Sequence, residues 1–459
     1  MTSPIVRFAP SPTGLIHIGN ARVALFNELF AKANNGRFIL RFDDTDSARS
    51  TAEFARAIEV DLAWLGIRPD ATFRQSARTS NYEAAATKLR ESGRLYPCYE
   101  TAEELEKRRK MQQARGLPPV YDRAALRLTP EEQKNYEEAG RRPHWRFKLA
   151  AGVIEWNDLI RGPTQIDCAA LSDPVLIRED GSFLYTLPSV VDDIDMQISH
   201  VIRGEDHVTN TAVQLQIFAS LSPNSPAPIF AHHNLLISAS GEGLSKRTGS
   251  LSISSLREEG YEAMAVAALA TLTGSSDNVH AVRDLRHLAQ TFDLAHVSRN
   301  PARFDPHDLE TLTHRTLALL EFEDVRERLA ALEIVGHKAE PLWRAARGNL
   351  ARFDEIKKWW RVIDAEITPV KEDADFLMQA AALLPAEPWG EQTWAAWTQE
   401  IKNASGRKGK TLFHPLRLAL TGEESGPELA LLLPLIGRAA ALHRLNHEDC
   451  STATPKSHG

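Results

Sequence analysis

The 459-residue chain has few of the features that mark secreted, membrane-bound or repetitive proteins. Its three cysteines, Cys98, Cys168 and Cys450, lie far apart, which excludes a disulfide framework and predicts a reducing compartment, the cytoplasm. No run of about 18 apolar residues is present, so we expect no membrane-spanning segment. The first residues lack a basic patch followed by an apolar stretch, so we expect no secretion signal.

The composition is that of an ordinary globular protein with room for several domains. Hydrophobic residues make up 43% and charged residues 25%, which excludes a chain that is disordered throughout. The net charge of −7 argues against indiscriminate binding to polyanions, but it allows a nucleic acid to dock on local basic patches. No repeat of roughly 20 to 50 residues is visible, which argues against a solenoid or propeller.

Strand and helix patterns alternate at the beginning of the chain. Residues 5–9 read as a buried strand, residues 20–33 as a helix and residues 37–42 as a second strand. This order predicts the α/β class, with a doubly wound parallel sheet of the Rossmann type. The same pattern returns at residues 198–202, followed by a helix over residues 210–221. Between the two halves, a charged stretch at residues 103–110 is followed by short strand-like runs such as residues 145–149, which indicates an α+β insertion.

The rest of the chain reads as helical. Beyond residue 303 the sequence is rich in Ala, Leu, Glu and Arg, and residues 321–332 have their apolar side chains on one face of a helix. The predicted organisation is residues 1–81 for the first half of the Rossmann-type domain, 82–188 for the insertion, 189–240 for the second half, 241–310 for a loop followed by helices, and 311–459 for helical modules.

Residues 7–22, RFAPSPTGLIHIGNAR, join the end of a strand to the start of a helix. The free N–H groups and positive dipole end of such a helix favour phosphate. Gly14 and Gly19 would let a nucleotide approach the backbone closely, and His17 could donate a hydrogen bond to phosphate oxygens as charge develops. His17 alone would more often be a solvent-exposed loop residue; the whole string indicates a phosphate site.

Residues 241–250, GEGLSKRTGS, form a second candidate phosphate-binding segment. A loop with a central Lys246 and Arg247 can close over a triphosphate and neutralise the leaving pyrophosphate. Taken alone, a loop rich in Gly, Ser and Lys is more often a solvated linker.

The two strings together resemble the signatures of class I aminoacyl-tRNA synthetases, in the form found in glutamyl-tRNA synthetases. Asn20 replaces the usual final histidine of the first signature, and Gly243 replaces the first lysine of the second. The resemblance implies that His17 and Lys246 are catalytic. It implies ATP contacts from Gly14, His17, Gly19, Asn20, Leu244, Ser245, Lys246 and Arg247.

The resemblance also implies a glutamate site. In this family an arginine binds the side-chain carboxylate of glutamate, because its planar fork matches two oxygens and rejects neutral side chains. Asp43 would face the substrate ammonium, where many relatives have a glutamate, and Ser189 stands where some relatives carry asparagine. The implied glutamate-binding residues are Arg7, Ala9, Ser11, Asp43, Tyr185 and Arg203.

The helical end resembles the family too. Residues 406–422 are similar to a C-terminal segment of bacterial glutamyl-tRNA synthetases, so the resemblance covers nearly the whole chain. It implies acceptor-stem binding by residues 82–188, stem contacts by 241–310 and anticodon binding by 311–459. Candidate RNA-binding patches are residues 107–110, 141–146, 357–361 and 407–410, where basic side chains would neutralise phosphates and aromatics could stack on bases.

Zinc can be judged from the donor residues. Some relatives bind it in the insertion through three cysteines and a histidine, and this chain has Cys98, Glu100, Ala125 and Arg127 at the matching places. One thiolate without a histidine does not complete a tetrahedral site, so we predict no structural zinc and a buried, apolar role for Cys98. Mg²⁺ is expected only as the counter-ion of ATP.

The implied reaction is ATP-dependent ligation of L-glutamate to the 3′ end of tRNA(Glu) through a glutamyl adenylate, with release of AMP and pyrophosphate. Glutamylation of tRNA(Gln) and use of glutamine instead of glutamate stay open. The helical C-terminal part argues against a shortened relative that modifies a tRNA base, and against a small nucleotidyltransferase. The presence of both His17 and Lys246 argues against a non-catalytic RNA-binding descendant. We expect a monomer.

Overall fold

The computed structural model describes residues 3–46, 48–238, 251–365 and 367–446. The chain forms two compact units, residues 1–309 and residues 310–459, which are described separately. In the described part of the chain, no helix combines the length and the apolar character needed to cross a membrane.

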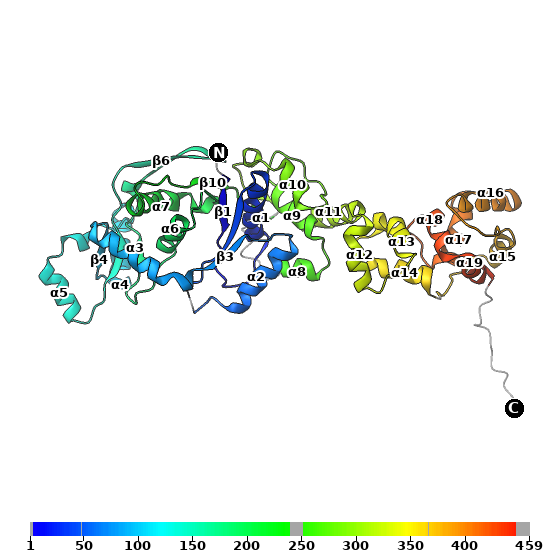
Figure 1. Cartoon of the computed structure of the whole chain (residues 1–459), viewed down its shortest axis with the longest axis horizontal. Coiled ribbons are helices and arrows are strands. Elements are labelled where there is room, and N and C mark those ends of the chain that lie inside the picture. Colours follow the sequence, from blue (N-terminus) through cyan, green and yellow to red (C-terminus); the bar gives the residue numbers. More distant parts are fainter. Residues whose placement is uncertain (1–2, 47, 239–250, 366, 447–459) are drawn as a thin grey trace, which may run out of the picture. The chain divides into compact units, whose positions relative to one another are not determined.

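A parallel sheet lies at the centre of the first unit (Figure 1). Strands β1 (Ile5–Phe8), β2 (Arg37–Phe42) and β3 (Ala71–Arg74) pair in parallel in that order. Helix α1 (Ile18–Ala33) connects the first two strands, and α2 (Ala52–Trp64) connects the next two. The predicted α/β class is therefore confirmed, and the predicted strand over residues 37–42 has the observed bounds.

The second half of the sheet consists of β9 (His200–Gly204) and β10 (Ile229–His233), parallel strands joined by α7 (Val208–Leu221). The Ser199 N–H donates to the Ile5 carbonyl over 2.9 Å, and this bond brings β9 beside β1. Buried apolar side chains such as Ile39, Val201 and Phe230 pack together across the two halves. The interrupted Rossmann-type sheet predicted from the sequence is thus present.

An α+β region separates the two halves. Its antiparallel sheet has the order β4-β5-β8, with a separate hairpin of β6 and β7. The elements are α3 (Thr79–Glu91), β4 (Leu95–Cys98), α4 (Ala102–Ala114), α5 (Pro130–Glu138), β5 (His144–Phe147), β6 (Val153–Asp158), β7 (Gly162–Asp167), β8 (Val175–Ile177) and α6 (Thr186–Asp195). Its core is continuous with α6 and α7, since Leu89 and Phe147 belong to one cluster with Val191 and Ile217.

The first unit ends in short helices and a small pair of strands. Strand β11 (Leu236–Ile237) pairs in parallel with β12 (Ala302–Arg303). Between them lie α8 (Ile253–Glu258), α9 (Ala263–Leu272) and α10 (Leu285–Thr291). Helix α9 packs on α1, because its alanine-rich side chains allow a close approach. Helix α11 (Pro306–Leu319) begins in this unit and continues into the next.

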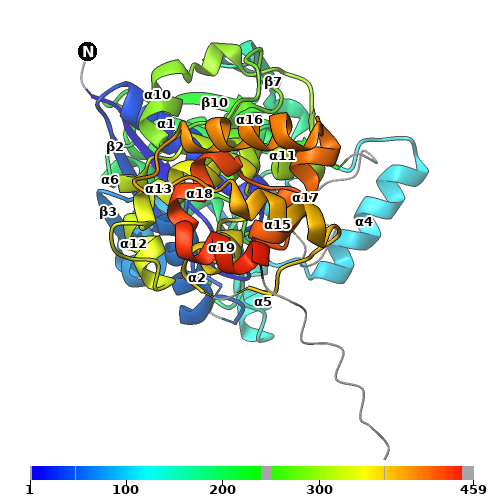
Figure 2. The same cartoon turned by 90° about the vertical axis from the view of Figure 1, so that its right-hand side faces the viewer.

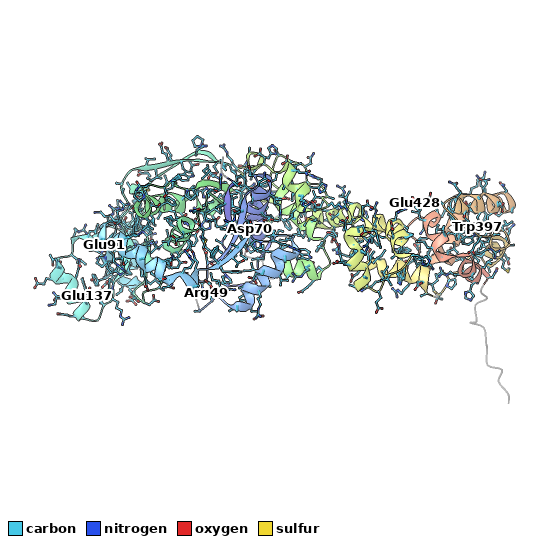
Figure 3. The ribbon with its side chains drawn as sticks, in the orientation of Figure 1. Arg49, Asp70, Glu91, Glu137, Trp397 and Glu428 are labelled. Carbon is cyan, nitrogen blue, oxygen red and sulfur yellow. The ribbon has the colours of Figure 1, made fainter. Side chains whose placement is uncertain are left out.

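The second unit consists of helices in its described part, as the sequence predicts. They are α12 (Phe322–Ala331), α13 (Ala339–Ala346), α14 (Ile356–Asp364), α15 (Ala374–Ala382), α16 (Thr393–Ser405), α17 (Lys410–Thr421), α18 (Leu429–Ile436) and α19 (Arg438–Asn446). Figure 2 faces α15, α17 and α19, which pack on one another. Trp397, labelled in Figure 3, is fully buried, and its indole N–H donates to the Ala380 carbonyl over 3.0 Å.

Candidate active site

The loop between β1 and α1 holds His17 at the start of the helix. His17 is the N-cap residue of α1, and its Nδ1 accepts a hydrogen bond from the Gly19 N–H over 3.0 Å. The Asn20 side chain accepts in return from the His17 N–H over 3.4 Å. Burial lowers the pKa of His17, which favours the neutral ring. Because Nδ1 accepts, the proton of this neutral ring lies on Nε2, which is then a hydrogen-bond donor.

Gly19 keeps the imidazole in place by having no side chain. A Cβ at this position would lie 2.9 Å from Cε1 of His17, whereas a Cβ at Gly14 would meet nothing within 4 Å. The backbone after the second predicted phosphate segment also returns to this point. The Ile18 N–H donates to the Leu251 carbonyl over 3.1 Å, and the Ile253 N–H donates to the Ile16 carbonyl over 3.0 Å.

A cavity of about 700 Å³ opens beside His17 at the carboxyl ends of β1 and β9. Every predicted site residue in the described part of the chain lines it: Arg7, Ala9, Ser11, Gly14, His17, Gly19, Asn20, Asp43, Tyr185 and Arg203. The predicted ATP-binding residues Leu244, Ser245, Lys246 and Arg247 lie outside the described residues, so their place in the site stays a prediction.

Two buried arginines are paired with acids: Arg7, which lines this cavity, and Arg41, which is bonded to the cavity residue Asp43. Arg7 lies 3.1 Å from Asp193, and Arg41 lies 2.7 Å from the same carboxylate and 2.8 Å from Asp43. Burial opposes ionisation of Asp193, but Arg7 and Arg41 hold its pKa below the ordinary value. Burial also raises the pKa of Asp43, against the effect of Arg41. The cluster therefore compensates its own charge to a large extent.

Arg203 is different, because no carboxylate lies within ion-pair distance of it among the described residues. It is 5% exposed, and its donors meet neutral acceptors, including the Tyr185 hydroxyl at 3.3 Å and Thr211 Oγ1 at 2.6 Å. Burial lowers the pKa of Arg203, as expected for a charge with little compensation. A buried guanidinium at a cavity wall without an acid favours an anionic ligand.

Sequence reasoning missed part of this site. Arg41 and Asp193 link the predicted residues Arg7 and Asp43, but neither belongs to a motif whose spacing reveals a pair. Arg22, on α1, also lines the cavity, is 1% exposed and has no acid partner among the described residues; it donates to the Ala270 and Thr273 carbonyls over 2.6 and 2.8 Å and to Asn234 Oδ1 over 2.5 Å. It ties α1 to the end of α9, a contact that only the folded chain brings about.

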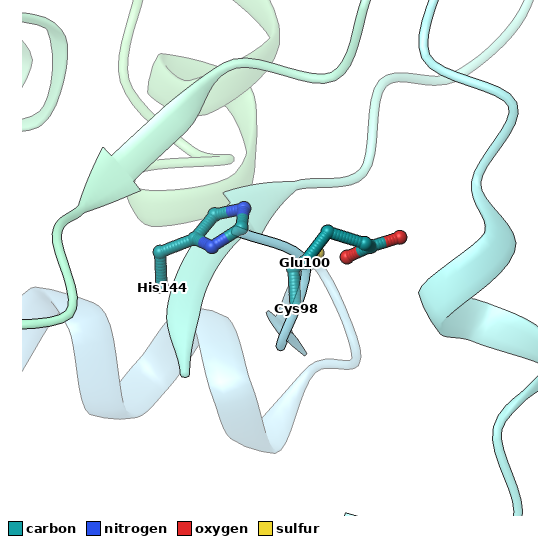
Figure 4. A group of neighbouring side chains, drawn as sticks. All are labelled: Cys98, Glu100 and His144. Carbon is teal, nitrogen blue, oxygen red and sulfur yellow. The ribbon is translucent and has the colours of Figure 1, made fainter. Parts of the chain in front are cut away.

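A group of possible metal ligands lies in the insertion (Figure 4). One ligand atom each from Cys98, Glu100 and His144 lies within 4.8 Å of the others. Cys98 and His144 are directly opposite each other on the paired strands β4 and β5. The interpretation that no histidine is available here is therefore wrong, because a neighbouring strand supplies one. Burial raises the pKa of Cys98 to about 12 and lowers that of His144 to about 4.

The surroundings of these side chains do not fit a closed zinc site. The Tyr121 hydroxyl donates to Glu100 over 2.8 Å, and Arg146 donates to Nε2 of His144 over 3.3 Å. A structural zinc site needs four ligands, and the described residues supply three, one of which faces a guanidinium. One oxygen of Glu100 has no partner among the described residues. Cys98 is fully buried, as predicted.

Comparisons with known proteins give the family. Residues 5–311 match the catalytic domain of tRNA synthetases class I (E and Q), and residues 361–448 match an anticodon binding domain. The chain belongs to the class I tRNA synthetases of the E and Q group. Glutamate–tRNA ligase 2 of Beijerinckia indica is 64% identical over 97% of this chain and 99% of its own length. Glutamate–tRNA ligase 2 of Methylobacterium sp. (strain 4-46) is 62% identical, with the same shares covered.

Solved structures agree with this assignment to the class I family. The crystal structure of a glutamate tRNA ligase from Elizabethkingia meningosepticum, in complex with its amino acid, has a TM-score of 0.81 and 27% identity. The match covers 97% of this chain and 99% of that one. A glutamate–tRNA synthetase from Elizabethkingia anophelis has a TM-score of 0.78 and 28% identity. The fold prediction, with an anticodon-binding helical part, is therefore confirmed.

The predicted RNA-binding patches of this synthetase are partly engaged in ion pairs. Arg108 lies 3.3 Å from Glu100, Arg407 lies 2.6 Å from Asp373, and Lys358 pairs with Glu423. In the patch at residues 357–361, Trp359 is 4% exposed and belongs to the core of the second unit. Trp359 is therefore excluded as a base-stacking residue, and the basic residues stay candidates.

Proposed function

We propose that this protein ligates L-glutamate to the 3′ end of tRNA(Glu) in two steps, through a glutamyl adenylate. One observation carries the proposal: a single cavity joins a helix start with a histidine donor to Arg203, a buried arginine for which the described residues supply no acid partner. The first suits the phosphates of ATP and the second suits the side-chain carboxylate of glutamate. The names of the relatives that match nearly the whole chain support the same substrate.

We assign the glutamate subsite to the Arg203 end of the cavity. Arg203 and Tyr185 bind the side-chain carboxylate, while the loop residues Ala9 and Ser11 line the same space. Arg7 contributes charge, although Asp193 compensates much of it. Asp43 faces the substrate ammonium. A neutral glutamine side chain would leave Arg203 buried without an anion, so this site discriminates against it.

We assign the ATP subsite to the His17 end. His17, through its Nε2–H, stabilises charge that develops on the α-phosphate. Gly14, Gly19 and Asn20 surround the phosphates. Lys246, with Leu244, Ser245 and Arg247, neutralises the leaving pyrophosphate, and Mg²⁺ enters as the counter-ion of ATP. The described residues Leu236 and Leu251 flank this segment, one at the cavity wall and one bonded to Ile18, which supports the assignment.

The α-carboxylate of glutamate attacks the α-phosphorus of ATP and displaces pyrophosphate. A ribose hydroxyl at the tRNA 3′ end then takes the glutamyl group from the adenylate and releases AMP. No covalent enzyme intermediate is required, so catalysis rests on positioning and on charge stabilisation. Residues 82–188 bind the acceptor stem, residues 241–310 contact the stem and residues 311–459 bind the anticodon. The enzyme works in the cytoplasm as a monomer.

The test is pyrophosphate exchange and aminoacylation with the full chain, using tRNA(Glu) and tRNA(Gln) transcripts and either glutamate or glutamine. We expect charging of tRNA(Glu) with glutamate and not with glutamine. Activation of glutamine in place of glutamate would overturn the assignment of the Arg203 subsite. Charging of tRNA(Gln) with glutamate as well would identify a non-discriminating enzyme.

A further inference from the structure

Arg203 is held from behind by two residues that line no part of its binding surface. Its Nε donates to Nε2 of His232 over 3.2 Å, and Nδ1 of His232 lies 2.5 Å from Oδ2 of Asp158. Both side chains are fully buried. His232 is on β10, beside Arg203 on β9, and the two residues are register partners in the parallel pair. Asp158 ends β6, so it belongs to the hairpin of the inserted region.

The protonation of this chain of residues follows from its hydrogen bonds. Nε2 of His232 accepts from a guanidinium, which has no lone pair, so the ring is neutral and its proton is on Nδ1. The Thr211 hydroxyl lies 2.9 Å from the same Nε2 and can donate to it as well. That N–H points to Asp158. Burial lowers the pKa of His232, in agreement with a neutral ring. Asp158 stays ionised, since hydrogen bonds from His232 and the backbone outweigh burial and lower its pKa to about 2.

Asp158 is itself fixed by the hairpin turn. Its Oδ1 accepts from the N–H groups of Ile160 and Arg161, each over 3.0 Å, and from the backbone N–H of His232 over 3.1 Å. The hairpin is also bonded to the sheet, because the Leu159 N–H donates to the Phe230 carbonyl over 2.9 Å. The carboxylate therefore has one orientation, and it transmits that orientation to the imidazole.

The hydrogen bonds of Arg203 within the protein leave part of its guanidinium available to a ligand. A guanidinium has five N–H donors. Nε is used by His232, and Nη2 is used by Thr211 and, at 3.4 Å, by the His207 carbonyl. Nη1 has the Tyr185 hydroxyl at 3.3 Å as its only partner among the described residues, so one of its N–H groups is available. Binding a carboxylate in a defined geometry requires that the other donors stay fixed.

We propose that His232 and Asp158 are positioning residues that orient Arg203 toward the side-chain carboxylate of the amino-acid substrate, and that the β6–β7 hairpin thereby sets the affinity for this substrate. The proposal rests on the proposed function, since it takes the Arg203 end of the cavity as the glutamate subsite. Neither residue touches the substrate. They act as outer partners do in other sites, where a second hydrogen bond fixes the tautomer and direction of a binding group.

Two variants at one position separate positioning from simple packing. In His232→Gln the amide oxygen can reach the place of Nε2 and accept from Arg203, but the bond to Asp158 is lost. In His232→Asn the amide can reach Asp158, but the acceptor for Arg203 is lost. We expect His232→Asn to raise the KM for glutamate roughly 10-fold or more, and His232→Gln to raise it less. His232→Asn and His232→Gln should have similar melting temperatures and similar KM values for ATP, so that the KM for glutamate alone separates them.

Asp158→Asn provides a test that changes no volume. An asparagine must accept with its oxygen from Ile160 and Arg161, so its NH₂ group faces His232 and favours the tautomer with the proton on Nε2. That tautomer no longer accepts from Arg203, and we expect the KM for glutamate to rise about 10-fold with little change in the KM for ATP. In the double variant with His232→Asn the two effects should not add, because both break the same connection.

The measurements are glutamate- and ATP-dependent pyrophosphate exchange with tRNA present, and thermal unfolding of each full-length variant. A glutamate KM that is unchanged in His232→Asn and Asp158→Asn, or that rises no more than the ATP KM, would overturn the proposal. Loss of stability in both His232 variants without a difference in glutamate KM would have the same meaning. Failure of the unaltered enzyme to activate glutamate would instead refute the proposed function.

Discussion

Two groups of polar side chains in the first unit can be compared: the buried group at the cavity leaves a charge for a ligand, and the partly exposed group around Glu100 in the insertion does not. At the cavity beside α1, Arg203 has neutral partners alone among the described residues. In the insertion, Arg108 faces the carboxylates of Glu100 and Asp122, at 3.3 and 3.5 Å. Both groups place several ionisable residues together, but in the second the protein supplies the counter-charges.

This difference shows why the number of polar side chains does not identify a site. A buried charge is costly unless it is compensated, and a protein that leaves one uncompensated at a cavity wall gains when a counter-ion binds. Arg203 meets this condition. Arg41, fully enclosed by Asp43 and Asp193, does not, although it is buried as deeply.

Arg203→Ala tests the comparison most severely. Removal of the guanidinium takes away a charge at the cavity wall that has an available N–H group and no acid partner among the described residues, so we expect the KM for glutamate to rise about 100-fold or more, with a much smaller change for ATP. Arg22 also lines the cavity without an acid, but its Nη atoms donate to the Ala270 and Thr273 carbonyls and to Asn234. Arg203→Lys is the matched control, because it keeps the charge but loses the planar fork. Its KM for glutamate should lie between that of the unaltered enzyme and that of Arg203→Ala. The measurement is pyrophosphate exchange at varied glutamate, and a normal KM in Arg203→Ala would contradict the assignment.

Arg7→Ala should have a smaller effect on glutamate, roughly 10-fold in KM, because Asp193 already compensates much of the Arg7 charge. The variant leaves Asp193 with Arg41 at 2.7 Å, so the fold should persist. Thermal unfolding and glutamate KM check these two expectations separately. An effect larger than that of Arg203→Ala would mean that the principal carboxylate site is at Arg7 and that the comparison is reversed.

The site residues that belong to short sequence motifs could be predicted from the sequence. The loop before α1 contains His17 and Gly19 within a few positions, and the strand ends carry Arg7 and Arg203, so the order of motifs was enough to bring them to one sheet edge. Bounds were close: the helix expected over residues 20–33 begins at Ile18, because His17 provides its N-cap.

Residues that act through a partner distant in the chain were not predictable in this way. Asp193 meets Arg7 and Arg41 only after the two halves of the sheet join, and Asp158 meets His232 only after the hairpin packs on β10. His144 was predicted only as part of the patch at residues 141–146, since its position opposite Cys98 depends on the pairing of β4 with β5. The sequence holds these residues, but strand register, not spacing, creates their contacts.

Gly19→Ala tests the His17 end of the cavity with an effect of intermediate size. The new methyl group would lie 2.9 Å from the imidazole and displace it, so we expect about a 10-fold loss in the rate of adenylate formation. Gly14→Ala serves as a control for thermal unfolding alone, because nothing in the protein lies within 4 Å of its added methyl group but Gly14 also lines the ATP end of the cavity. Single-turnover kinetics measure the rate, and thermal unfolding without nucleotide should be altered by Gly19→Ala only. If Gly19→Ala slows adenylate formation while both variants unfold at the normal temperature, the added methyl group crowds ATP directly instead of displacing His17.

Metal removal should have the smallest effect, and it tests the other side of the comparison. Tyr121 and Arg108 donate hydrogen bonds to Glu100, and Arg146 donates to His144, so these side chains need no metal ion. Dialysis of the purified protein against a strong zinc chelator should therefore change its melting temperature by less than about 2 °C. A structural zinc contributes on the order of 10 kcal/mol to folding, so its loss would be obvious. Elemental analysis of the untreated protein gives an independent measure, with well under one zinc per chain expected. Stoichiometric zinc, together with a large fall in melting temperature on chelation, would mean that Glu100, Cys98 and His144 do leave a charge for a ligand, and the contrast with Arg203 would no longer hold.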